Sequence, residues 1–348
     1  MERILTYAEA IREGTEQEMA RDPSVLVLGI GVDDFKAIYG TSRGLVEKFG
    51  RERVFDTPLS EDAMTGVAIG AALAGLRPIH VHIRMDFVLL AMNQLVNIAA
   101  KGRYMYGGAV SVPLVVRSII GRSWGQGAQH SQSFHSYFIH IPGLKVVAPS
   151  TPYDAKGCLI QSIRDDNPVI FVEHRMLHYQ KGHVPKPEYT TPLGKARVLA
   201  KGDDITLVGI SYMAVECLRA QKLLAEVGIS AEVIDPVSLN PFDLDTIAGS
   251  LRKTGRLLVV DTAWVTCGAS AEIIAQIAER LQDSQEIRLH RMGFEPVSCP
   301  TTKNLEDLFY PNSQKIASAA YTLVYNNRKF WTPTHVEAPE IMEFRGPF

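Results

Sequence analysis

Strand-like and helix-like patterns alternate along most of this 348-residue chain, and the alternation limits its possible folds. Short apolar runs, such as residues 25–28 and 169–173, indicate buried strands. Residues 7–20 and 152–165 instead repeat their apolar side chains with helical spacing. Strands that alternate with helices predict a parallel sheet covered on both faces, which is a doubly wound α/β fold.

The chain is long enough for two domains of ordinary size. Both periodic patterns stop at residues 178–192, where Pro185, Pro187 and Pro192 fall, and then restart. We therefore predict a first α/β domain at residues 1–180 and a smaller one at 181–325. Residues 326–348 form a proline-containing tail whose aromatic side chains are costly to leave in water. Either a partner or its own domain covers them.

Composition excludes several classes of protein. The 36 basic and 38 acidic residues give a formal charge of −2, so the sequence offers no electrostatic argument for nucleic-acid binding. The four cysteines form neither a CxxC pair nor a dense framework, which favours reduced thiols. The most apolar stretch, residues 67–76, is shorter than the roughly 20 residues that span a bilayer. We expect a cytoplasmic protein without a membrane segment.

The usual phosphate-binding and hydrolase motifs are missing, and two other clusters carry polar groups. Residues 56–61 form a turn that ends in Glu61 at the start of an Ala- and Gly-rich helix. Glu61 is either a helix-start carboxylate stabilised by the helix dipole or a carboxyl whose proton matters. His130 follows a glycine-rich loop, where a histidine facing a ligand and a simple surface histidine are equally plausible.

Two weaker patterns could hold a metal ion. Residues 165–168 read Asp-Asp-Asn-Pro between a helix and a strand, which indicates a capped turn rather than a cation site. His80 and His82 alternate along a predicted strand and so share one face of it, but no third ligand follows. Metal binding is therefore the less favoured reading of both patterns.

Several segments together resemble one protein family over residues 6–311. The matching runs are YGTSRGL (39–45), DTPLSE (56–61), GAALAGLRP (70–78), GAQHSQ (127–132), PGLKVVAPS (142–150) and IRDDNP (163–168). Their order and spacing resemble the β subunit of the thiamine-diphosphate-dependent E1 component of 2-oxo acid dehydrogenases, of the pyruvate, branched-chain and acetoin types. The resemblance implies a pyrimidine-binding domain followed by a transketolase C-terminal domain, in agreement with the predicted α/β architecture.

The resemblance also implies site residues. Glu61 matches the family glutamate that bonds to N1′ of the cofactor aminopyrimidine, where a carboxyl can drive the proton transfers that activate thiamine. Leu59 and Phe87 match positions beside the cofactor ring, although core filling is the other explanation for Phe87. His130 matches an active-site histidine that binds substrate or assists acyl transfer.

The family also implies metals and partners. By resemblance a potassium ion is held by carbonyls at Leu114, Ser162, Ile163, Asp165 and Asn167. The chain lacks the Gly-Asp-Gly and Asn-Asn motif for Mg²⁺ and pyrophosphate. The resemblance therefore implies a separate α subunit that binds Mg²⁺ and shares the active sites in an α2β2 heterotetramer.

One departure from the family pattern concerns the chemistry. After the first long strand the family usually has Leu-Gly-Glu-Asp-Val, whereas this chain reads Leu-Gly-Ile-Gly-Val, with Ile30 in place of the acid. Asp33 or Asp34 could substitute for that acid, the two active sites could be uncoupled, or the acyl acceptor could differ.

The main function expected is therefore decarboxylation of a 2-oxo acid with transfer of the acyl unit to lipoamide on an E2 partner. One alternative is a thiamine enzyme that transfers an acyl or two-carbon unit to a small molecule in a biosynthetic pathway. The other is a non-catalytic subunit that holds the α subunit through its aromatic tail.

Overall fold

The computed structural model describes residues 3–34, 37–122, 125–281 and 286–334. They divide into two compact units, of which the first comprises residues 1–120 and 137–193 and the second comprises residues 121–136 and 194–348. The segment 121–136 thus belongs to the second unit, although the sequence-based division kept it in the first domain. This segment contains no long helix or strand, so hydrophobic periodicity could not show that it belongs to the second unit.

The first unit contains most of the strands and helices expected from the sequence. In chain order they are β1 (Ile4–Thr6), α1 (Tyr7–Arg21), β2 (Val25–Gly29), α2 (Ala37–Gly40), α3 (Leu45–Phe49), β3 (Val54–Phe55), α4 (Glu61–Leu73), β4 (Arg77–His82), α5 (Met85–Val88), η1 (Leu89–Ala91), η2 (Gln94–Ala99), α6 (Ala100–Met105), β5 (Val115–Ile120), α7 (His135–Ile139), β6 (Lys145–Val147), α8 (Pro152–Arg164), β7 (Val169–His174), η3 (Arg175–Leu177) and β8 (Lys181–His183).

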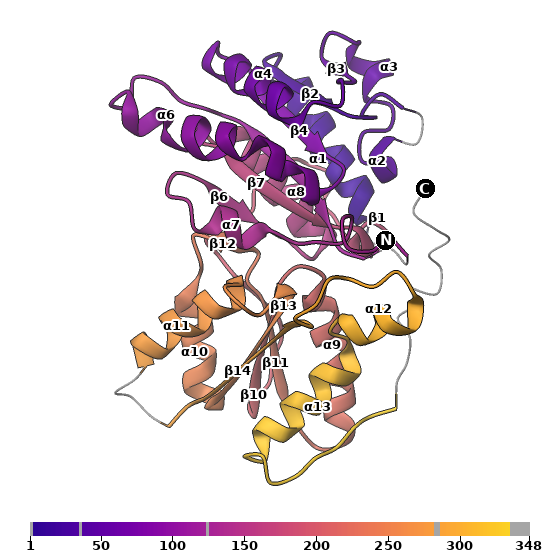
Figure 1. The fold of residues 1–348 in the computed structure, drawn as a ribbon, viewed down its shortest axis with the longest axis vertical. Coiled ribbons are helices and arrows are strands. Elements are labelled where there is room, and N and C mark those ends of the chain that lie inside the picture. Colours follow the sequence, from indigo (N-terminus) through magenta and orange to yellow (C-terminus); the bar gives the residue numbers. More distant parts are fainter. Residues whose placement is uncertain (1–2, 35–36, 123–124, 282–285, 335–348) are drawn as a thin grey trace. The chain divides into compact units, whose positions relative to one another are not determined.

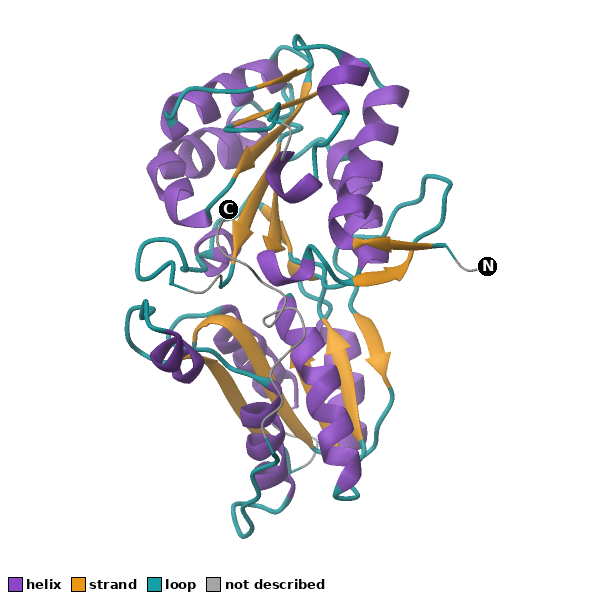
Figure 2. Cartoon of the chain, turned by 90° about the vertical axis from the view of Figure 1, so that its right-hand side faces the viewer, coloured by secondary structure: helices purple, strands orange, loops and turns teal. Residues whose placement is uncertain are grey.

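The strands of this unit form a parallel sheet in the order β6-β7-β5-β4-β2-β3 (Figure 1). Gly29 ends β2 opposite Val81 of β4 with φ +150°, and a Cβ at Gly29 would lie 2.4 Å from the Val81 carbonyl oxygen. Only glycine fits that approach. A separate antiparallel pair, β1 with β8, lies near the N-terminus (Figure 2).

Helices cover this sheet and confirm the predicted α/β class. Helix α1 begins with a capping box, in which the Thr6 hydroxyl accepts from the Glu9 N–H at 3.2 Å, and it packs against α8. Helix α4 packs against β4, η1 and η2. Residues 85–105 are divided among α5, η1, the π-helical η2 and α6. Strand β5 begins at Val115, after Pro113, which has no N–H to donate to a ladder.

The second unit repeats the plan on a smaller scale. Its elements are β9 (Arg197–Ala200), β10 (Ile205–Gly209), α9 (Tyr212–Glu226), β11 (Ala231–Asp235), β12 (Ser238–Asn240), α10 (Leu244–Thr254), β13 (Arg256–Trp264), α11 (Ala269–Leu281), β14 (Arg288–Phe294), α12 (Lys303–Phe309) and α13 (Ser313–Val324). The five-stranded sheet has the order β14-β13-β10-β11-β9, and only the β11–β9 pair is antiparallel.

Helices lie on both sides of the second sheet, α10 with α11 on one side and α9 with α13 on the other (Figure 1). One cluster of the core in this unit is mainly aromatic and contains Phe294, Phe309 and Tyr310, with the partly buried Trp264 packed against it. Among the described residues, no helix is both long enough and apolar enough to cross a bilayer.

The start of the predicted tail lies on α13. Trp331 packs against Tyr321 with ring centroids 5.5 Å apart, and the Gln314 Nε2 donates to the Pro333 carbonyl at 2.7 Å. Phe330 is nevertheless 79% exposed. The tail aromatics Phe344 and Phe348 lie outside the described residues. Up to residue 334, then, the chain covers part of its own tail.

Candidate active site

Glu61 is the first residue of α4, in the turn that follows β3. The Ser60 N–H donates to the Pro58 carbonyl at 2.8 Å, and Ser60 precedes the helix without a side-chain cap. The Glu61 side chain is half-buried, and no described residue gives its carboxylate a hydrogen bond or an ion pair. A carboxylate at a helix N-terminus is stabilised by the helix dipole, so it can remain unpaired and available to a ligand.

Two exposed apolar side chains lie in the loops beside the same sheet edge. Leu59 precedes Glu61 and is 81% exposed, while Phe87 on α5 follows β4 and is 36% exposed. Because β3 and β4 are parallel and separated only by β2, the segments that follow them meet at the carboxyl edge of the sheet. Ligands of open α/β sheets bind at this edge. The first unit therefore brings an unpaired carboxylate and apolar surface to one place.

The loop after β2 lies at this edge too, and it contains the position where the family acid is replaced. Ile30 is half-buried there, and the Gly31 N–H donates to the Asp56 carboxylate at 2.7 Å, which ties this loop to the one before Glu61. Of the two candidate substitutes, Asp33 is already paired with Arg51 at 2.7 Å, while Asp34 is exposed. Neither carboxylate therefore occupies the position of the family acid in the sequence, where Ile30 stands.

His130 lies in the segment that belongs to the second unit. Residues 128–130 are exposed, whereas Ser131 and residues 133–135 are buried. Gly127 lies against Thr301, whose Cγ2 would be 2.7 Å from a Cβ at that position. The segment thus packs closely on both sides of His130, which is itself exposed.

Charged contacts fix both ends of the His130 segment within the second unit. At one end Arg122 donates to Asp307 at 2.8 Å and to Glu306 at 3.3 Å, and burial raises the pKa of Glu306 although Arg122 opposes that rise. At the other end His135 Nε2 lies 3.0 Å from the buried Asp261 carboxylate. Sequence reasoning missed these anchors, because Asp261 and Glu306 are more than 120 residues away along the chain.

The carbonyls expected to hold potassium are already hydrogen-bonded. Arg77 Nη1 donates to the carbonyls of Ile163 at 3.0 Å and Asp165 at 3.2 Å, and Arg77 Nη2 donates to the Asp166 carboxylate at 2.6 Å. The Leu114 carbonyl accepts from the Val169 N–H, and that of Ser162 accepts from the Asp165 N–H. The remaining candidate, Asn167, donates its N–H to the Asp165 side chain. The Arg77 guanidinium thus supplies a positive charge to two of these carbonyls, Ile163 and Asp165.

Comparison with known proteins shows the family of this chain. Residues 4–180 match the model of the transketolase pyrimidine-binding domain, and residues 194–316 match that of the transketolase C-terminal domain. The β subunit of acetoin:2,6-dichlorophenolindophenol oxidoreductase from Cupriavidus necator is 42% identical over 92% of this chain and 97% of its own length. The pyruvate dehydrogenase E1 β subunit of Porphyra purpurea is also 42% identical, over 93% of this chain and 98% of its own.

The chain belongs to the β subunits of thiamine-diphosphate-dependent E1 enzymes. The family is transketolase-like and α/β, as the sequence predicted. A solved split-gene transketolase, described as an inactive β4 tetramer, has the same fold with a TM-score of 0.74 at 21% identity, over 93% of this chain and 99% of that one. Members of this family work with an α subunit, so an α partner is implied for this E1 β subunit too.

The residues at the sheet edge fit the aminopyrimidine of thiamine diphosphate. The free Glu61 carboxylate can share a proton with a ring nitrogen, and the exposed Leu59 and Phe87 offer apolar surface to a flat ring. This E1 β subunit also carries polar groups that the sequence did not assign. His82, Arg84 and Ser118 are buried on β4 and β5 or shortly after β4, and each has a side-chain atom without a partner.

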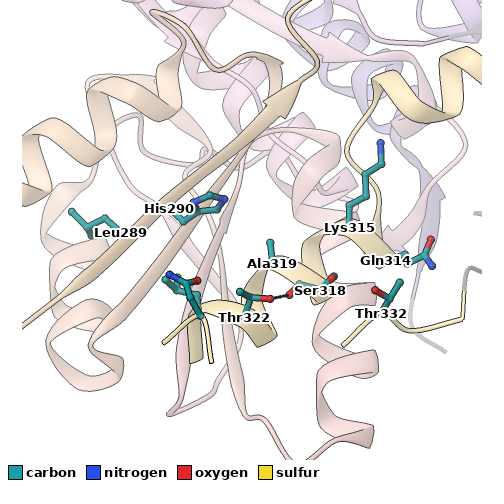
Figure 3. Close-up of a pocket in the computed structure, with 10 residues that line it drawn as sticks. Leu289, His290, Gln314, Lys315, Ser318, Ala319, Thr322 and Thr332 are labelled. Atoms are coloured by element: carbon teal, nitrogen blue, oxygen red, sulfur yellow. Dashed lines mark hydrogen bonds between the residues drawn. The ribbon is translucent and has the colours of Figure 1, made fainter. Parts of the chain in front are cut away.

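A cavity of about 520 Å³ in the second unit has none of the predicted site residues in its lining. It lies between β14, α13 and residues 327–332, with His290, Ser318 and Thr322 in its wall (Figure 3). The Thr322 hydroxyl donates to the Ser318 carbonyl at 3.0 Å, and the Lys315 Nζ is bonded to the carbonyls of residues 307, 308 and 310. The cation nearest this cavity is therefore already in use.

Proposed function

We propose that this chain is the β subunit of an E1 enzyme that decarboxylates a 2-oxo acid and transfers the acyl unit to lipoamide on an E2 partner. The observation that carries the proposal is the unpaired Glu61 carboxylate at the start of α4, with exposed Leu59 and Phe87 at the same sheet edge. Relatives about 40% identical, named pyruvate dehydrogenase E1 or acetoin oxidoreductase β subunits, support it.

In this proposal the residues of the first unit bind and activate the cofactor. When bound, thiamine diphosphate supplies the carbon nucleophile for the keto group and accepts the electron pair that decarboxylation releases. Glu61 would hold N1′ of a bound aminopyrimidine and share a proton with it. Leu59 and Phe87 would offer apolar surface to the ring.

His130 supplies the second set of contacts, to substrate and acyl group. Its exposed position lets it reach a bound molecule, and an imidazole can donate or accept a proton near neutral pH. The proposal assigns the diphosphate and Mg²⁺ to the α subunit in an α2β2 assembly. It includes a cytoplasmic location, which cell fractionation would test.

The decisive experiment reconstitutes the chain with an α subunit and measures CO₂ release from 2-oxo acids. We expect Glu61→Gln to lower the rate by at least about 100-fold, because the amide cannot share the required proton. Asp62→Asn removes an exposed carboxylate from the same helical turn and serves as the matched control. Full activity in Glu61→Gln would contradict the proposal and favour a non-catalytic assembly role.

The acyl acceptor needs its own assay. Reduction of an isolated lipoyl domain by the complex is the expected result. Ile30 gives a specific reason to test the alternative, since an apolar side chain stands where the family usually has an acid. If the complex instead turns over small ketones or sugars and does not reduce lipoyl domains, the acyl acceptor is a small molecule and not E2.

A further inference from the structure

Three buried polar atoms without partners lie on β4 and β5 or shortly after β4. They are Nε2 of His82, Nε of Arg84 and Oγ of Ser118, and these side chains belong to residues that are 5%, 9% and 0% exposed. The one hydrogen bond of Arg84 within the described chain runs from Nη1 to the carbonyl of Ile83, at 2.9 Å. Buried polar groups nearly always have partners, so such a cluster indicates a missing ligand or water.

The strand register brings two of these groups together. His82 is the Cα partner of Ser118 in the parallel β4–β5 pair, so both side chains lie on one face of the sheet. Arg84 lies two residues after the end of β4, in extended backbone just before α5. The cluster therefore lies at the carboxyl edge of the sheet, where Glu61 and Phe87 also lie.

The contact between His80 and Thr65 relates the cluster to Glu61. The two histidine rings are 4.2 Å apart, and His80 Nδ1 lies 3.4 Å from the Thr65 hydroxyl, so α4 covers this face of β4. Glu61 lies four residues before Thr65 on α4, a rise of about 6 Å. His82 lies two residues beyond His80, a rise of about 6.6 Å in the same direction. Glu61 and His82 therefore lie at nearly the same position along the direction of the strands.

The three groups are suited to an anion. Burial lowers the pKa of His80 to about 4 and that of His82 well below its ordinary value, so both imidazoles are neutral at neutral pH. The Arg84 guanidinium remains charged and faces no carboxylate within salt-bridge distance among the described residues. A buried cation without an acid is costly, and a bound carboxylate would offset that cost. The Ser118 hydroxyl and His82 Nε2 can each donate a further hydrogen bond.

The chemistry of decarboxylation decides which carboxylate Arg84 would bind. The carboxylate that leaves as CO₂ loses its charge on the way to the transition state. Pairing it with a guanidinium would stabilise the ground state more than the transition state and slow the reaction. A second carboxylate, which keeps its charge throughout, carries no such penalty. Arg84 therefore suits an acidic group on the side chain of the substrate.

We propose that Arg84, with His82 and Ser118, binds a side-chain carboxylate of the substrate, so that the enzyme prefers 2-oxo dicarboxylic acids to neutral 2-oxo acids. The substrate assignment rests on the proposed function, whereas the anion site is a property of the first unit alone. No bond is made or broken at this site.

The test compares 2-oxoglutarate with 2-oxopentanoate, which has the same five carbons without the second acid. In the complex with the α subunit we expect kcat/KM to favour 2-oxoglutarate, and Arg84→Met to lower that preference by at least about tenfold. Arg84→Lys should restore part of it, since the charge returns without the fork of donors. Arg103→Met, which removes an exposed arginine from α6, is the control.

The outcomes separate the site from the function. Brisk turnover of 2-oxopentanoate, with a preference that Arg84→Met leaves unchanged, would overturn the site and keep the proposed function. If neither acid is turned over, 2-oxoglutarate should still raise the unfolding temperature of the full chain but not that of Arg84→Met. Equal effects on both chains, or none, would mean that the cluster holds only water. Should Arg84→Met not fold, Ser118→Ala keeps the charge, removes one donor and should still weaken the preference severalfold.

Discussion

Glu61 and Glu173 are carboxylates of one unit with opposite environments. Glu61 is half-buried without a partner at a helix start, whereas Glu173 is fully buried between Arg117 and His178. The Arg117 Nε and Nη2 atoms donate to the two Glu173 oxygens at 2.6 and 2.9 Å, and His178 Nε2 lies 3.2 Å from one of them. The first arrangement leaves a carboxylate free for a ligand, and the second uses one to hold the sheet together.

Glu173 should account for part of the acid sensitivity of the chain. Burial alone would raise the pKa of Glu173, but Arg117 and His178 outweigh it and lower the pKa from 4.5 to about 2. A depressed carboxylate pKa stabilises the fold above pH 4.5, and this stability is lost as pH falls toward 2. We expect Glu173→Gln to cost about 3 kcal/mol at pH 7, because Arg117 then keeps a buried charge without its partner.

Urea unfolding between pH 7 and pH 3 measures this effect. The variant should lose stability less steeply than the parent chain below pH 4.5. Glu47→Gln, on the exposed side of α3, provides the control and should follow the parent. Parallel curves for the parent and Glu173→Gln would show that the acid sensitivity arises elsewhere.

Arg77 supplies a positive charge at the turn before β7, where potassium was expected. Its guanidinium already donates to the carbonyls of Ile163 and Asp165, so exchange of K⁺ for Na⁺ should shift the unfolding temperature by less than about 2 °C. Arg77→Met frees these oxygens and should make stability depend on K⁺. Differential scanning calorimetry at constant ionic strength measures both. If K⁺ but not Na⁺ strongly raises the unfolding temperature of the parent chain, the chain binds potassium even with Arg77 in place.

At the scale of elements, the segment that carries His130 and the start of the tail share one property. Neither has a periodic pattern, and each takes its position from side chains distant in sequence. Arg122 and His135 hold the His130 segment through acids of the second unit, and Gln314 and Tyr321 of α13 hold residues 331–333.

Two truncations separate the roles of the tail. A chain that ends at residue 334 keeps the contacts of Trp331 and Pro333 with α13, so its unfolding temperature should match that of the full chain. A chain that ends at residue 325 loses these contacts and should be less stable by about 1–2 kcal/mol. Calorimetry measures the difference.

Assembly with the α subunit, followed by light scattering, tests the partner role of the tail. Weaker assembly of the chain that ends at residue 334 is expected if residues 335–348 meet the partner. If the shortened chain assembles with the α subunit as well as the full chain does, residues 335–348 are not needed to bind the partner.

At the scale of the whole molecule, the sequence predicted the α/β class and the family, and both are confirmed. Periodicity was sufficient because parallel sheets bury both faces of their strands, which leaves short apolar runs between helices. Motifs that are local in sequence, such as residues 56–61, also placed Glu61 at a helix start as the structure has it. Its role in catalysis stays a prediction.

The tertiary structure alone decided which side chains share an environment. His82 and Ser118 are 36 positions apart along the chain but adjacent across the β4–β5 pair, and Arg77 reaches carbonyls 86 and 88 positions away. Local sequence determines whether a residue lies on a strand, a helix or a turn. Strand order and register determine its neighbours, and they result from burying all the apolar faces at once. For this reason the sequence could single out Glu61 as the predicted cofactor carboxylate, whereas only the fold showed that the Arg84 Nε atom is buried without a hydrogen-bond partner.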